Sequence, residues 1–135
     1  MVCIYCGGTT FVTNSRKQKR SNAIWRRRSC NACRGIFTTL ETVDYATAII
    51  VTSLEQHREF SRDKLFVSVY ESCKHRKDAQ ASATLLTDTI IKQLYPLIKD
   101  ASLSVKSIRK VTLKTLHRFD EVAGVHYKAY HPDTN

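Results

Sequence analysis

Apolar residues recur at helical spacing through the second half of the chain. The first stripe follows Ser61, a residue type that commonly caps a helix, and ends before a charged stretch at 74–78. Its members are Leu65, Phe66, Val69, Tyr70 and Cys73. A second helix is predicted over 79–95 and ends near Pro96, because proline cannot continue a helix. We expect Cys73 to be a small buried hydrophobe within this core.

Two further helices and one strand complete the predicted C-terminal half. A third helix begins near Ser104 or Ser107 and has an apolar face made of Ile108, Val111, Thr112, Leu116 and Phe119. A short final helix opens over 120–125. Ahead of the helices, residues 45–52 are largely apolar and end in β-branched side chains, which predicts a strand, with a turn at 54–56. The pattern therefore predicts an α+β helical domain with a small amount of sheet.

The first 45 residues have a different pattern. Two short strands are predicted over 9–13 and 23–28, joined by the polar stretch 14–22. Because the composition changes near residue 45, we expect two domains, 1–45 and 46–135. The first of these is too small to fold on a hydrophobic core alone.

The spacing of the cysteines indicates a metal site, which could stabilise the small domain in place of a hydrophobic core. Cys3 and Cys6 form one CxxC pair, and Cys30 and Cys33 form another. Two such turns can direct four thiolates at one tetrahedral Zn²⁺, which would be structural because no coordination position stays open. A disulfide framework and a redox CxxC motif are weaker alternatives: the chain opens on Met1 without a secretory leader, and Cys6 is followed by glycines. We expect a cytoplasmic protein.

Positive charge is concentrated near the cysteines. Residues 1–45 hold eight Lys or Arg against two acids, out of a net charge of +10 for the chain. A metal-stapled hairpin with cations on its surface suits a nucleic-acid groove. The candidate DNA-binding residues are Ser15, Arg16, Lys17, Trp25, Arg26, Arg27 and Arg28. Alternation along a strand would place Arg26 and Arg28 on one face and Trp25 and Arg27 on the other. Trp25 either packs over the zinc knuckle or contacts bases, and the cations either bind DNA or only solvate the domain.

Other functional classes find little support. The chain has four glycines and no glycine-rich phosphate loop, its five histidines are scattered, and no nucleophile and base form a recognisable pair, so we do not expect an enzyme. No apolar run approaches the roughly 18 residues of a membrane span.

Several motifs together resemble the NrdR family, whose members repress bacterial ribonucleotide reductase genes. They are Cys3-Ile4-Tyr5-Cys6-Gly7, Asn14-Ser15-Arg16, the Arg26-Arg27-Arg28 run before Cys30, Phe37-Thr38-Thr39-Leu40-Glu41, and Phe119-Asp120-Glu121-Val122-Ala123. The resemblance covers essentially the whole chain. It implies a zinc ribbon that binds paired promoter boxes in duplex DNA, and an ATP-cone, a helical bundle capped by a short sheet, that binds ATP or dATP and resets a homo-oligomer.

The resemblance also implies nucleotide-binding residues. Lys64 would contact phosphate, Val51 and Tyr127 the base or ribose, and Arg58 would assist. The family's first cone strand carries a phosphate-binding lysine, whereas this chain has Val51-Thr52-Ser53 there. Without this lysine, we expect nucleotide binding to be weaker, differently selective or absent. The alternative function is a zinc-ribbon adaptor whose helical domain binds proteins without nucleotide control.

Overall fold

The computed structural model describes residues 1–19, 21–53 and 56–132. The chain divides into two compact units, Met1–Val43 and Asp44–Asn135, and the division lies two residues before the boundary expected from composition. The strands and helices confirm the predicted α+β class. Residues 54 and 55 of the predicted turn, and Arg20 of the hairpin loop, lie outside the described residues.

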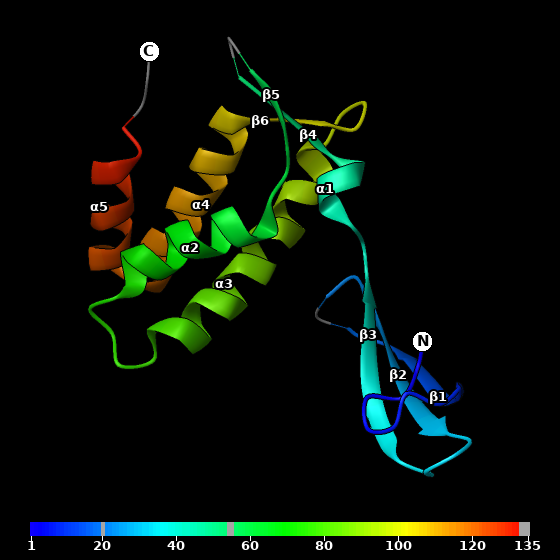
Figure 1. Cartoon of the computed structure of the whole chain (residues 1–135). Coiled ribbons are helices and arrows are strands. Elements are labelled where there is room, and N and C mark those ends of the chain that lie inside the picture. Colours follow the sequence, from blue (N-terminus) through cyan, green and yellow to red (C-terminus); the bar gives the residue numbers. More distant parts are fainter. Residues whose placement is uncertain (20, 54–55, 133–135) are drawn as a thin grey trace. The chain divides into compact units, whose positions relative to one another are not determined.

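The N-terminal unit is one antiparallel sheet of three strands (Figure 1). Its strands are β1 (Thr10–Lys17), β2 (Ala23–Cys30) and β3 (Ile36–Thr42), with β2 in the centre. β1 begins one residue after the predicted strand and runs four residues beyond it, and β2 runs two residues beyond its predicted end. The prediction that Ser15, Arg16 and Lys17 lie in the hairpin loop was therefore wrong, because the pairing with β2 continues through them. The third strand was not predicted. A bulge between Val12 and Asn14 shifts the register of β1 against β2. The buried cluster of this unit is very small: it consists of Cys3, Cys30 and Phe37.

The C-terminal unit combines a second small sheet with a group of packed helices. Its elements are α1 (Tyr45–Ala48), β4 (Ile50–Thr52), β5 (His57–Glu59), α2 (Arg62–Cys73), α3 (Ala79–Leu94), η1 (Tyr95–Leu97), β6 (Ser102–Ser104), α4 (Val105–Phe119) and α5 (Glu121–Tyr130). β4 pairs with β5 antiparallel and with β6 parallel. Since α2 follows β5 and α4 follows β6 almost directly, both helices begin at the sheet (Figure 1).

Helix positions largely follow the sequence pattern. Ser61 caps α2 by accepting a hydrogen bond from the backbone N–H of Lys64, and Ser104 caps α4 in the same way. Two predictions were wrong in extent. Tyr45–Ala48 is helical and not part of a strand, because the Asp44 side chain accepts from the N–H of Ala46 and starts a turn there. The last helix runs to Tyr130 and is longer than predicted.

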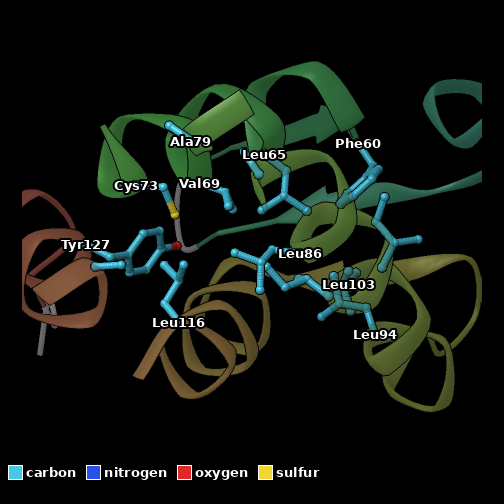
Figure 2. Close-up of a cluster of buried hydrophobic side chains, with 14 of the residues drawn as sticks. Phe60, Leu65, Val69, Cys73, Ala79, Leu86, Leu94, Leu103, Leu116 and Tyr127 are labelled. Carbon is cyan, nitrogen blue, oxygen red and sulfur yellow. The ribbon is translucent and has the colours of Figure 1, made fainter. Parts of the chain in front are cut away.

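The core of this unit lies between the helices, with α2 packing on α3 and α5, and α4 packing on α3 and α5. Figure 2 shows Val69, Cys73, Leu86, Leu116 and Tyr127 converging on it from these helices. Cys73 is fully buried, as expected, and burial raises the pKa of its thiol. Among the described residues, no helix is both long enough and apolar enough to cross a membrane.

Candidate metal centre and nucleic-acid interface

The two CxxC turns bring four sulfur atoms together. Cys3 and Cys6 come from the N-terminal turn, Cys30 ends β2, and Cys33 lies in the turn that follows. All four Sγ atoms lie within 4.8 Å of one another, with 3.6 Å between those of Cys3 and Cys33 and 3.5 Å between those of Cys6 and Cys30. Tetrahedral Zn²⁺ with bonds of about 2.3 Å separates its sulfurs by about 3.8 Å. The donor set and its spacing therefore fit zinc.

Both turns use the same backbone arrangement. The residue after each pair has a left-handed backbone, with φ of 73° at Gly7 and 57° at Arg34. In each turn a backbone N–H points at a cysteine sulfur, from Tyr5 and from Gly35, over 3.4 Å. Such N–H groups stabilise negative charge on sulfur. The turns are therefore formed to hold thiolates.

The thiols influence one another strongly. The backbone N–H of Cys33 is the main reason that the pKa of Cys30 is lowered to about 6. The N–H of Gly35 likewise lowers the pKa of Cys33, but the neighbouring sulfurs and desolvation outweigh it and raise that pKa to about 12. Four sulfurs this close cannot all ionise near neutral pH without a cation among them. A divalent metal would supply that charge, and a closed shell of four thiolates makes its role structural.

The register of the ribbon sorts its arginines onto two faces, as strand alternation predicted. Arg26 and Arg28 share one face with Ser15 and Lys17. The Nε and Nη2 atoms of Arg26 donate to a carboxylate oxygen of Glu41 over 3.1 and 2.7 Å. Nε of Arg28 donates to the Thr39 hydroxyl over 3.3 Å. Both guanidinium groups are therefore engaged within the ribbon.

The other side of the sheet, which we call the Trp25 face, is different. Its principal residues are Phe11, Arg16, Trp25, Arg27, Ile36 and Leu40, which lie in paired rows across the three strands. Arg27 is exposed and forms no ion pair with any described residue. The Arg16 guanidinium carbon lies 6.0 Å from the centre of the Trp25 ring, within cation–π range. This face thus presents two cations beside an aromatic ring.

Uncovered apolar side chains complete the Trp25 face. Phe11 is 50% exposed, Ile36 52% and Leu40 59%. Three large apolar side chains exposed on one face of a small sheet favour an interaction surface there. None of the three residues was predicted from the sequence, although alternation along 36–42 indicates Ile36 and Leu40 once that segment is recognised as a strand.

Trp25 does not pack over the metal site. The buried cluster there is formed by Cys3, Cys30 and Phe37, with the Tyr5 ring edge-on to Phe37 at 6.2 Å. Trp25 lies five residues before Cys30 on an extended strand, about 17 Å away. Its indole is instead half-buried under Arg16, so the core alternative for this residue was wrong.

The predicted nucleotide residues do not all come together. Val51 on β4 pairs directly with Arg58 on β5. Lys64 is exposed in the first turn of α2 and lines a cavity of about 590 Å³ with residues of α2 and α5, Asp63 and Glu71 among them. Tyr127 is only 4% exposed and packs in the helical core, where burial raises its pKa (Figure 2). The structure therefore gives Tyr127 a packing role.

Comparison with known proteins agrees with this architecture. Residues 1–41 match the family model described as the NrdR-like transcriptional repressor N-terminal domain, a zinc ribbon. The chain is 34% identical over 128 residues to the transcriptional repressor NrdR of Rhodospirillum rubrum, covering 94% of this chain and 84% of that protein. It is 32% identical over 134 residues to NrdR of Phenylobacterium zucineum, with 98% and 86% coverage. The chain therefore belongs to the NrdR family of transcriptional repressors.

Proposed function

We propose that this chain represses transcription by binding duplex DNA through the Trp25 face of its zinc ribbon. One observation carries the assignment to this face: Arg16 and Arg27 form no ion pair with a described residue, whereas Arg26 is held by Glu41. Arg27 and Arg16 would approach phosphates or guanine edges, and the exposed apolar side chains would contact sugars or thymine methyl groups. Zinc would hold these side chains in fixed positions.

By family resemblance, the target is the promoter of ribonucleotide reductase genes. The test compares binding of the zinc-loaded chain to a duplex with two promoter boxes and to a scrambled duplex of equal length and composition. We expect tighter binding to the boxes, and loss of that preference after the metal is chelated, because the Cys3, Cys30 and Phe37 cluster is too small to hold the ribbon alone. Equal affinity for both duplexes at physiological salt would refute the proposal.

We further propose that ATP and dATP regulate the repressor by changing its homo-oligomeric state. Val51, Arg58 and Lys64 would contact the nucleotide, while Tyr127 would support the site from the core. The pairing of Val51 with Arg58 supports this proposal, since it puts a cation beside a half-buried apolar side chain. Regulation of this kind requires each nucleotide to bind the competing assemblies with different affinity.

Calorimetry with ATP and dATP, together with mass measurement of the oligomer, tests the nucleotide proposal. Saturable heat and a nucleotide-dependent mass would support it. No heat with either nucleotide would favour the adaptor alternative, in which the helical unit binds proteins only. Two observations favour that alternative. The family's phosphate-binding lysine is missing after Val51, and two carboxylates, Asp63 and Glu71, border the cavity beside Lys64.

A further inference from the structure

The excess of positive over negative charge in the C-terminal unit lies in one helix, α4. From Asp44 to Asn135 the sequence has fourteen Lys or Arg and eleven Asp or Glu. Five of the basic residues and none of the acidic ones lie in α4. The rest of the unit therefore holds nine basic and eleven acidic residues, a net charge of −2, while α4 alone holds +5. Solvation does not require such segregation, because a solvated surface usually mixes both signs.

Four of the five cations form one line along α4, which we call the α4 stripe. They are Lys106, Lys110, Lys114 and Arg118, spaced four residues apart, and all are exposed. The buried residues Thr112, Thr115 and Leu116 lie on the opposite side of the helix. Twelve residues of helix span about 18 Å. The stripe is therefore an extended row of cations directed at solvent.

Stripe cations differ from Arg62 and Arg76 of the same unit, which are both paired with carboxylates. Nη2 of Arg62 lies 2.7 Å from a carboxylate oxygen of Asp88, and Nε of Arg76 lies 3.0 Å from one of Asp78. Within the described part of the chain, no ion pair involves a residue of the stripe. Lys106 stands in the first turn of α4, where the helix dipole disfavours a cation. Pairing therefore does not explain the stripe, and the helix dipole favours only Arg118, which stands in the last turn.

We propose that the α4 stripe binds the phosphate backbone of duplex DNA, as a contact separate from the zinc ribbon and independent of base sequence. This inference rests on the proposed DNA-binding function. An 18 Å length of duplex carries about ten phosphates, so four cations in a row meet a matching line of negative charge. A membrane surface fits less well, because the apolar face of α4 is already buried in the core and cannot enter lipid.

Salt dependence of binding tests the stripe. In the full chain we would replace Lys106, Lys110, Lys114 and Arg118 by Gln, which keeps helix propensity while removing four charges. The affinity for a scrambled duplex is measured by fluorescence anisotropy between 50 and 200 mM salt. If all four cations contact phosphates, the slope of log affinity against log salt falls in magnitude by about 3.6, or about 0.9 per contact.

A matched control separates local contact from net charge. The variant with Lys77, Lys92, Lys99 and Lys128 replaced by Gln removes the same charge from exposed, scattered positions. We expect its slope to change by less than 1, and we expect the melting temperatures of both variants to stay near that of the parent. A third variant, with Lys106→Arg, Lys110→Arg and Lys114→Arg in an otherwise unchanged chain, conserves the charge of the stripe and should keep the parent slope. Equal slopes for the stripe variant and the control would overturn the inference.

One further variant distinguishes failure of this inference from failure of the proposed function. Replacing Arg16 and Arg27 by Gln should remove the preference for promoter boxes. The part of the salt dependence that comes from the α4 stripe should remain in this variant. If the parent chain discriminates promoter from scrambled duplex and the stripe variant keeps its full slope, only the stripe inference fails. If the parent binds neither duplex, both fail. If the stripe variant loses binding to an acidic protein and not to DNA, the surface serves a protein partner and the inference is wrong.

Discussion

Arg27→Gln should weaken DNA binding without destabilising the ribbon. Arg27 is exposed and has no ion pair with a described residue, so the free energy of unfolding should change by no more than about 0.5 kcal/mol. A bidentate contact with guanine is worth about 1 to 3 kcal/mol, which corresponds to a loss of roughly 5- to 150-fold in affinity. The effect should therefore fall almost wholly on binding.

Arg26→Gln is the matched control. It removes the same charge one residue away, from the other face of β2. Its ion pair with Glu41 joins side chains that are 30% and 60% exposed, so losing the pair should cost at most about 1 kcal/mol of stability. We expect a smaller loss of affinity than for Arg27→Gln, because the guanidinium of Arg26 is already engaged.

Fluorescence anisotropy with promoter and scrambled duplexes, at several salt concentrations, measures both variants. A base contact by Arg27 predicts a loss on the promoter duplex only. A phosphate contact predicts equal losses on both duplexes and a slope reduced by about 0.9. If Arg26→Gln loses as much affinity as Arg27→Gln, or more, at equal zinc content and unchanged melting temperature, the assignment of the Trp25 face is refuted.

Three further predictions concern the metal site, the core and pH. Gly35→Ala should weaken zinc binding in a chelator competition assay, because a Cβ there would lie 2.5 Å from a ring carbon of Tyr5; unchanged zinc affinity would contradict this. Leu116→Ala should destabilise the C-terminal unit by about 2 to 5 kcal/mol in urea unfolding, since Leu116 is fully buried; a cost under 1 kcal/mol would count against the described core. The hydrogen bond from His75 is the largest cause that lowers the pKa of Asp120 from 3.8 to about 2. The stabilisation of the fold by ionised Asp120 is therefore present above about pH 4 and is lost as the pH falls to 2. Asp120→Asn should abolish that part of the pH dependence of the melting temperature, and an unaltered profile would speak against it.

Local sequence signals predicted the elements that depend on local interactions. Ser61 and Ser104 start helices through their own side chains, and the cysteine pairs predict their cluster because each turn is closed within four residues. The helical stripes were equally informative, since a 3.6-residue period needs no knowledge of partners. Cys73 falls in the core for that reason.

Sheet pairing was the part that local signals could not supply. β5 and β6 have only three residues each, and β6 is a strand because it pairs with the distant β4. β3 has seven residues and pairs with the neighbouring β2, but its pattern was not recognised as a strand. Because β3 was not predicted, Glu41 could not be placed beside Arg26, and their ion pair could not be predicted from the sequence. The same gap hid Leu40, which joins the Trp25 face only through its pairing with Trp25.

The parallel pairing of β4 with β6 also determines when the C-terminal unit can assemble. Val51 pairs with Leu103, fifty-two residues later, and α2 and α3 lie between them. Closing so long a loop is slow compared with forming the helices. During synthesis the three-stranded sheet cannot form before β6 has left the ribosome. Until then Val51 can pair only within the β4–β5 hairpin, and a two-stranded hairpin is marginally stable. The backbone amides at the centre of β4 should therefore exchange with solvent only on global unfolding, which makes them a sensitive hydrogen-exchange probe of whether this unit has folded to completion.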